Sequence, residues 1–167
     1  MFKIGDLIIY GSTGVCKVTD IAVIDHIGIE GKSYYAITPL YQCGTIYVPT
    51  DNKKVFMRPI ISIAEVEQLI DTIPSTEAEA FHCNASNGLI KHYDSALKSH
   101  ECKHLIELAM SIHAKKEFVA KQNRKLGSID EKYLKRAEDL LFGEMAAALN
   151  ITRDEMPEYI SDRLRQS

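Results

Sequence analysis

The sequence predicts an α+β protein, in which a small β-domain over residues 1–60 precedes an all-α helical bundle over residues 61–167. Two observations lead to this class. Up to residue 58, short runs of strand-forming residues alternate with turn residues. From Ser62 onward, apolar residues recur at spacings of three and four, which is typical of helices. The change of period is the predicted domain boundary.

The first part is predicted to contain five short strands: Leu7–Tyr10, Val15–Asp25, Ser33–Leu40, Thr45–Pro49 and Val55–Met57. The first two are joined by a turn that carries Gly11 and Gly14, so they are expected to form a hairpin. Short strands at this spacing are typical of a small barrel or a strongly bent sheet. Because about 60 residues bury only a modest share of their surface, this domain is expected to pack on the helices.

Helix start signals organise the second part. Ser62 and Glu65 fit a capping box, and an apolar stripe follows until Pro74. Residues 75–88 are expected to be a linker or a loosely formed turn of helix around Phe81, and a short helix is predicted over Leu89–Leu97.

A longer helix is predicted from His100 to Leu126, with Ser99 as its cap and Gly127 as its stop. Its expected core face is Leu105, Leu108, Ala109, Ile112 and Val119. Further capping boxes at Ser128–Glu131 and Thr152–Glu155 predict a helix over Ile129–Leu149, ended by Asn150, and a final helix after it. The second part is therefore expected to be a bundle of about five helices.

The charge distribution limits how the chain can bind nucleic acid. Residues 1–60 carry six Lys/Arg and five Asp/Glu, a net charge of +1, whereas residues 61–167 carry fourteen and eighteen, a net charge of −4. Any DNA contact must then be local, because phosphate attraction depends on clustered cations. One such cluster lies between Lys98 and Lys125, with seven Lys/Arg and three Asp/Glu. It fits a phosphate-binding helix face or, alternatively, a solvated surface with lysines near a helix carboxyl end.

Composition also excludes several classes. No apolar run approaches the ~20 residues of a membrane span, and the start lacks a signal-peptide pattern, so a cytoplasmic protein with reduced cysteines and no membrane partner is expected. His100 and His104 are expected on one helix face, but two histidines do not supply the four ligands of a structural zinc site. No catalytic grouping has motif support. The expectation is a protein that is not an enzyme and has no cofactor or metal site.

Four tyrosines in or next to the predicted strands raise the question of an aromatic cage: Tyr34, Tyr35, Tyr41 and Tyr47. A cage of this kind binds cations through cation–π contacts. Because strand alternation puts Tyr34 and Tyr35 on opposite faces, only part of the set can converge. Packing in the core and at the rim is the preferred interpretation.

Three stretches together resemble a known family. Phe2-Lys-Ile-Gly-Asp-Leu-Ile-Ile-Tyr10, then Gly14, then Gly44-Thr-Ile-Tyr-Val-Pro49 look like the amino-terminal domain of the CarD/CdnL transcription regulators, and the Gly143–Met145 step resembles their helical domain. The resemblance implies a Tudor-like β-barrel that binds the β subunit of bacterial RNA polymerase. It also implies a helical domain that binds promoter DNA at the upstream edge of the bubble and modulates open-complex formation.

The resemblance assigns residues to these roles. Polymerase would be bound by Thr45, Ile46, Tyr47, Val48 and Pro49; DNA would be bound near Ser86, Lys91 and Lys132, with Lys121, Arg124 and Lys125 of the basic cluster. Tyr47 stands where the family commonly has an arginine, and it cannot form that residue's bidentate ionic contact. The expected docking mode is then packing plus pairing along a strand edge.

The DNA-binding part departs further. Ser86 stands where the family usually has a tryptophan, and the chain contains no tryptophan. An aromatic wedge gains its energy by stacking on an unpaired base, which serine cannot do. The alternative function is therefore a polymerase-binding protein–protein adaptor with weak or no DNA binding. The chain is expected to be a monomer or, through its sheet edges, a domain-swapped dimer.

Overall fold

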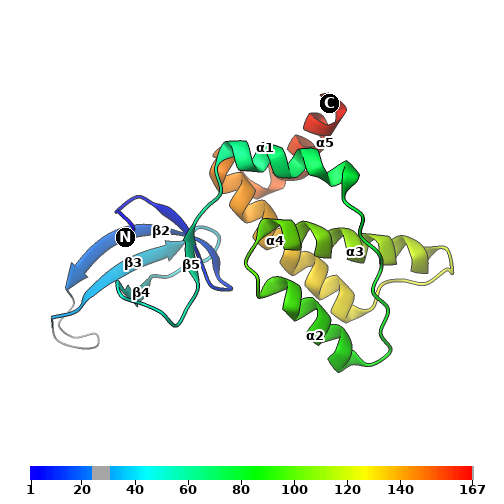
Figure 1. Cartoon of the computed structure of the whole chain (residues 1–167), viewed down its shortest axis with the longest axis horizontal. Helices are drawn as coiled ribbons and strands as arrows, with labels where there is room; N and C mark the ends of the chain where they lie inside the picture. The colour runs from blue at the N-terminus through cyan, green and yellow to red at the C-terminus, as the bar shows by residue number, and fades with distance from the viewer. Residues whose placement is uncertain (24–30, 167) are drawn as a thin grey trace.

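The computed structural model describes residues 1–23 and 31–166, and it has a sheet at one end and helices at the other (Figure 1). The five strands are β1 (Leu7–Tyr10), β2 (Gly14–Val23), β3 (Ser33–Pro39), β4 (Ile46–Pro49) and β5 (Met57–Pro59). They form one antiparallel sheet in the order β4-β3-β2-β1-β5. The predicted α+β class, with a Tudor-like sheet domain followed by helices, is confirmed.

The predicted hairpin is formed by β1 and β2, with Ile8 opposite Cys16 and Tyr10 opposite Gly14. Alternation sends one side chain in two to the core of the sheet domain. That core is made of fully or nearly fully buried side chains: Ile8, Cys16, Val18, Tyr35, Ile37 and Val48. The last two residues of the predicted Val15–Asp25 strand lie outside the described residues.

The fifth strand begins later than the predicted Val55–Met57. The side chain of Asn52 accepts hydrogen bonds from the backbone of Lys54 (3.0 Å) and Val55 (3.3 Å), and it donates to the Val55 carbonyl (2.8 Å). This local Asx turn occupies the backbone groups that a strand would need. Pairing therefore starts at Met57, opposite Tyr10.

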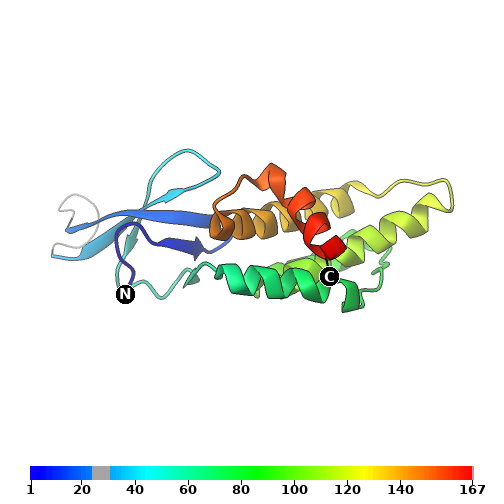
Figure 2. The ribbon, with the colours of Figure 1, turned by 90° about the horizontal axis from the view of Figure 1, so that it is seen from above.

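In the described part of the chain, five α-helices follow the sheet: α1 (Ile63–Thr72), α2 (Ser86–Leu97), α3 (Cys102–Ala120), α4 (Ser128–Leu149) and α5 (Met156–Gln166). Single 3₁₀ turns at Ile73–Ser75 and Arg153–Glu155 follow α1 and precede α5. Seen from above, α1 and α4 lie on opposite sides of the bundle at the end that meets the sheet (Figure 2). Across the described residues, no helix is both long and apolar enough to cross a bilayer.

Two of the three predicted capping boxes are formed. Ser62 and Glu65 form a reciprocal capping box at the start of α1, and Thr152 and Glu155 form another before α5. Asn150 ends α4 in the left-handed region, with φ of 57°, a conformation that asparagine tolerates. The expected core face of the long helix is buried, Ile112 completely.

The long helix α3 is shorter than predicted at both ends. His100 has φ of 56° and Glu101 is the N-cap, so Ser99 does not cap it. At the other end, Asn123 takes φ of 57° and Arg124 N–H reaches back to the Val119 carbonyl (2.9 Å), which ends the helix at Ala120. The predicted stop at Gly127 was wrong, because an earlier asparagine makes the left-handed turn.

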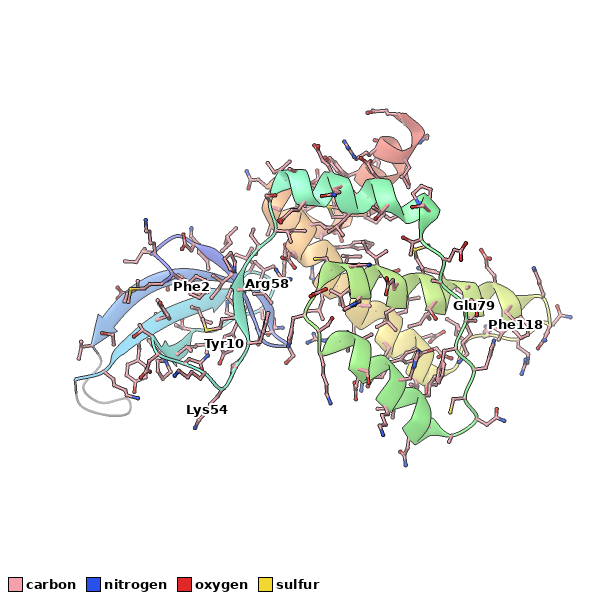
Figure 3. The ribbon with its side chains drawn as sticks, in the orientation of Figure 1. Phe2, Tyr10, Lys54, Arg58, Glu79 and Phe118 are labelled. Carbon is pink, nitrogen blue, oxygen red and sulfur yellow. The ribbon has the colours of Figure 1, made fainter. Side chains whose placement is uncertain are left out.

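Gly127 is instead the N-cap of α4. Ser128 therefore lies inside the helix, and the predicted Ser128–Glu131 capping box is not formed; Glu131 N–H bonds to the Gly127 carbonyl at 3.1 Å. The segment between α1 and α2 crosses α3, where Ser111 donates to the Glu79 carbonyl (2.7 Å; Figure 3). The predicted linker is thus bonded to the bundle.

Candidate functional site

The strand β4 is an open edge of the sheet. Among the described residues it pairs with β3 alone, and the opposite edge of the sheet is β5. An unpaired strand edge presents backbone N–H and C=O groups that another chain can bind. The residues predicted to dock on polymerase lie here.

The register shows which backbone groups face outward. Thr50 N–H donates to the Ser33 carbonyl (3.0 Å), and Val48 lies opposite Tyr35. Hydrogen-bonded and non-hydrogen-bonded pairs alternate along an antiparallel ladder. Counting from Thr50, Val48 belongs to a bonded pair, so the N–H and C=O of Tyr47 point away from β3 toward the open edge.

The five predicted docking residues differ in their exposure. Thr45 precedes the strand and is exposed, while Ile46 and Pro49 are half-buried. Tyr47 keeps 45% of its surface exposed, whereas Val48 keeps only 2% and packs in the sheet core. Tyr47 and Thr45 therefore offer side chains to a partner, and Val48 can act only by supporting the strand.

The opposite edge, β5, is tied to the helical domain by an ion pair. The Arg58 guanidinium, on β5, donates to both carboxylate oxygens of Glu144 on α4, at 2.5 Å and 2.8 Å. It also donates to the backbone carbonyl of His100, just before α3, at 2.7 Å and 3.2 Å. Figure 3 shows Arg58 on the side of the sheet that faces the helices. The hydrogen bonds to Glu144 raise the Arg58 pKa, so the guanidinium stays charged.

Glu144 is 1% exposed and fully bonded. Besides Arg58, it accepts from the backbone N–H of Ile61 (3.0 Å) and from the Cys102 thiol (3.1 Å). Burial, and then the Glu144 charge, raise the pKa of Cys102, which keeps it a neutral donor. One carboxylate thus joins β5, the segment entering α1, the start of α3 and the last third of α4.

Further contacts complete this connection between the sheet and the helical domain, which we call the joint. The Tyr41 hydroxyl donates to the Gly143 carbonyl (2.8 Å), and the Arg153 guanidinium lies 4.2 Å from the centre of the Tyr41 ring. A Cβ on Gly143 would approach the ring to 2.9 Å, so only glycine admits this contact. The turn of the first hairpin also touches α4, where Arg136 donates to the Ser12 carbonyl. The expected packing of the sheet on the helices is confirmed.

Sequence reasoning missed the roles of Arg58, Glu144 and Tyr41 in this joint. The local signal for Glu144 is a lone acid within the apolar run from Leu140 to Ala148. A charged residue at such a position is almost never buried unless it is paired. The partner lies 86 residues away, and no local pattern identifies it.

Residues 2–61 match the family described as the CarD-like/TRCF RID domain. The amino-terminal domain belongs to this family. The match spans all five strands and ends before α1, so it includes both the open edge and Arg58. It confirms the resemblance of the amino-terminal stretches and supports a transcription-related role in binding RNA polymerase. A comparison with curated proteins found no match.

The predicted DNA-binding residues lie in the helical domain, beyond the RID domain. Ser86 is the first residue of α2 and Lys91 lies one turn further along; both are exposed. Lys132 is exposed near the start of α4 and lines a hollow of about 300 Å³ between α2 and α4, together with Lys135 and Arg136.

Lys121, Arg124 and Lys125 lie in the loop between α3 and α4 and not on the predicted helix face. Arg124 and Lys125 line a second hollow, of about 510 Å³, with Lys116 and Lys135. Lys135 and Asp139 line both hollows, so the two adjoin along α4. The loop therefore brings its cations beside those of α4, with carboxylates of α4 between them.

One member of the basic cluster cannot bind phosphate. Lys115 is 9% exposed and donates to Asp130 (3.0 Å), which also accepts from the Tyr93 hydroxyl (2.6 Å). Burial and this hydrogen bond raise the pKa of Tyr93. Lys115 instead fixes α3 to the start of α4.

Several of the histidines and tyrosines considered above have structural partners. His100 precedes α3 and stacks on Phe56, with ring centres 4.5 Å apart, so it does not share a helix face with His104 as predicted. Among the described residues, no three of the His, Cys, Asp and Glu side chains are placed to hold a metal ion. Tyr34 and Tyr35 are buried, and Tyr41 packs on α4.

Proposed function

We propose that this protein is a bacterial transcription regulator that binds the RNA polymerase β subunit through the β4 edge of its RID domain. In the same complex, the helical domain would contact promoter DNA at the upstream fork and modulate open-complex formation. The observation that carries the proposal is the unpaired β4 edge of a domain that belongs to the RID family.

The expected docking mode is strand addition. A polymerase strand would pair with the outward backbone groups of Tyr47 and Thr45, while the half-exposed Tyr47 ring would supply buried area and one hydroxyl. Main-chain pairing does not require the arginine that the family commonly has at this position. This mode therefore accommodates the tyrosine.

The proposed effect on transcription follows from differential binding. A protein that contacts the open complex better than the closed one shifts that equilibrium by the difference in its affinities. The cations offered to DNA are Lys91, Lys132, Lys121, Arg124 and Lys125. The joint at Glu144 would hold them at a fixed position relative to the docked RID domain.

Two substitutions of the full chain separate main-chain from side-chain docking. Tyr47→Pro removes the outward N–H and the ring, whereas Tyr47→Ala removes the ring alone. Strand addition predicts that a polymerase β fragment is bound about tenfold more weakly by Tyr47→Pro than by Tyr47→Ala. Phe118→Ala is the matched control, because Phe118 is exposed to a similar extent (47%) on α3. Equal binding by all four proteins at low salt would refute docking at β4.

The adaptor function is the second candidate. It is favoured by the burial of Lys115 and by the serine at position 86, which remove a phosphate ligand and an aromatic wedge. Titrating salt against binding to fork-junction DNA discriminates the two, since each phosphate contact adds about −0.9 to the slope of log K against log salt. A slope near zero would favour the adaptor. Transcription initiation with Lys91→Ala, compared with the unaltered protein, would show whether a DNA contact matters to the outcome.

A further inference from the structure

The helical domain has a groove between α1 and the first half of α3, next to the segment that enters α1 from the sheet. Its volume is about 780 Å³, which is within the range of ligand-binding clefts. In the ribbon, α1 and α3 lie apart on this side of the bundle (Figure 1), and residues of both helices line the groove. None of the predicted polymerase or DNA residues lines it.

The floor of the groove is apolar. Ile106 of α3 is 5% exposed, and Ile61 and Leu69 are partly buried against the core of the bundle. Half-buried apolar side chains at the base of a groove gain free energy when a partner removes their remaining surface from water. The groove therefore suits an apolar anchor.

The walls of the groove are anionic. Glu65 of α1 and Glu101 and Glu107 of α3 line it, and the exposed cation on its walls is Lys103. The other lining cation, Arg58, is already bound by Glu144. Within the described residues, neither Glu65 nor Glu107 has a Lys or Arg partner within 4.0 Å.

A neighbouring hollow extends this charge. It has a volume of about 450 Å³, shares Glu107 with the groove, and adds Glu77 and Glu79 from the segment that crosses α3. The combined surface carries five carboxylates around an apolar floor. It would repel the phosphates of DNA and attract a cationic partner.

We propose that this groove is a docking site for a cationic amphipathic helix of a partner protein. Leu, Ile or Met side chains at spacings of three and four would fill the floor, and flanking Lys or Arg would meet the carboxylates on either wall. A helix laid between two helices buries a continuous apolar stripe, as in other helix-in-groove complexes. The proposal is independent of polymerase and DNA binding.

A pair of peptides tests the proposal against the full chain. One is an amphipathic helix of about 15 residues made of Leu and Lys, and the other has the same Leu positions with Glu in place of Lys. Anisotropy at about 0.15 M salt is expected to show binding of the Lys peptide alone. Equal binding of both peptides, or no binding of the Lys peptide up to about 1 mM, would overturn the proposal.

Substitutions locate the site. The Glu101→Gln/Glu107→Gln double variant is expected to bind the Lys peptide about tenfold more weakly. The side chain of Glu101 makes no capping hydrogen bond, so the helix is kept. Glu117→Gln/Glu158→Gln makes the same charge change at exposed positions outside the groove and is expected to change affinity less than about twofold. Amide NMR shifts of the unaltered protein should map to α1 and α3; shifts confined to other helices, or competition by fork DNA, would contradict the assignment.

Discussion

The two edge strands of the sheet, β4 and β5, differ in what lies beyond them. Past β5, the Arg58 guanidinium meets a buried carboxylate and a backbone carbonyl of the helical domain. Past β4, the described residues provide no further strand, and Tyr47 projects outward. The β5 edge is tied to the helices by a side chain, and the β4 edge keeps its outward backbone groups for a partner.

This difference shows how a small sheet can be both stable and open to a partner. A domain of about 60 residues gains little from its own core, so tying one edge to the helices compensates for leaving the other edge unpaired. The same tie fixes how the helical domain sits when the free edge is docked. Stability should therefore respond strongly to changes at β5 and weakly to changes at β4.

The largest effect is expected from Glu144→Ala, which breaks the tied edge. The substitution leaves the part-buried Arg58 guanidinium and the Ile61 N–H without their acceptor. Breaking a buried ion pair by removing one partner costs about 3–5 kcal/mol of unfolding free energy. Urea denaturation followed by circular dichroism measures it.

The matched control for Glu144 is Glu138→Ala, also on α4. Glu138 pairs with His113 at 2.8 Å, but its side chain is 31% exposed and that of His113 53% exposed. A pair of this exposure contributes at most about 1 kcal/mol. A loss from Glu144→Ala no larger than the loss from Glu138→Ala would show that β5 is not held by this ion pair.

Features of the fold that depend on local contacts could be predicted from the sequence better than those that depend on distant contacts. The boxes at Ser62 and Thr152 and the stop at Asn150 were predictable, because each depends on residues within one turn. The end of α3 was not, since Asn123 and Gly127 are both competent stops and the chain uses the first. Likewise, Lys115 was predicted with the surface cations, and only the fold reveals that Asp130 lies beside it.

The open edge was predicted better than the joint. The strand over Thr45–Pro49 was found to within one residue, because alternation and flanking turn residues mark it in the sequence. The Arg58–Glu144 pair spans 86 residues. The sequence around Arg58 predicts only an ordinary exposed cation. Its role depends on how two domains pack, which periodicity does not encode.

The second-largest effect, a difference of about 3 kcal/mol in unfolding free energy, is expected between proline substitutions that remove N–H groups from the two edges of β4. Val48→Pro removes an N–H that bonds to β3, whereas the N–H removed by Tyr47→Pro faces the open edge. Proline is tolerated on an edge strand only where its missing N–H faces solvent. Thermal unfolding should show a much larger loss for Val48→Pro. Equal losses of stability would mean that the backbone N–H of Tyr47 does not face the open edge.

A smaller effect, of about 1–2 kcal/mol, is expected as coupling between Tyr41 and Gly143 in a double-mutant cycle. With the ring present, a Cβ at position 143 would lie 2.9 Å from it and displace it. In a Tyr41→Ala chain the clash is gone, and Gly143→Ala should then stabilise α4 by about 1 kcal/mol through helix propensity. The cycle is measured by urea denaturation of the four proteins. Additive changes would show that the ring does not pack on the helix.

The last prediction involves the smallest expected change in stability. It compares the thiol reactivity of one cysteine near each edge. Cys43, in the loop before β4, is exposed, whereas Cys102, at the tied edge, is buried. A neutral buried thiol reacts slowly, so Ellman's reagent at pH 8 should modify Cys43 at once and Cys102 only when the joint opens. Because the folded-state pKa of Cys102 is raised, the stability that its protonated thiol contributes is complete below the unfolded pKa of 9.0 and is lost as the pH rises above it.

A Cys16→Ala/Cys83→Ala background removes the other two thiols, so the two remaining rates can be assigned directly. In that background, Glu144→Ala should accelerate the reaction of Cys102 and leave the rate at Cys43 unchanged, because the substitution removes the acceptor of the thiol and loosens the packing around it. Acceleration at both positions would indicate general unfolding, and acceleration at neither would indicate that the joint stays closed without its carboxylate. A change at Cys102 alone would tie the protection of that thiol to the β5 edge.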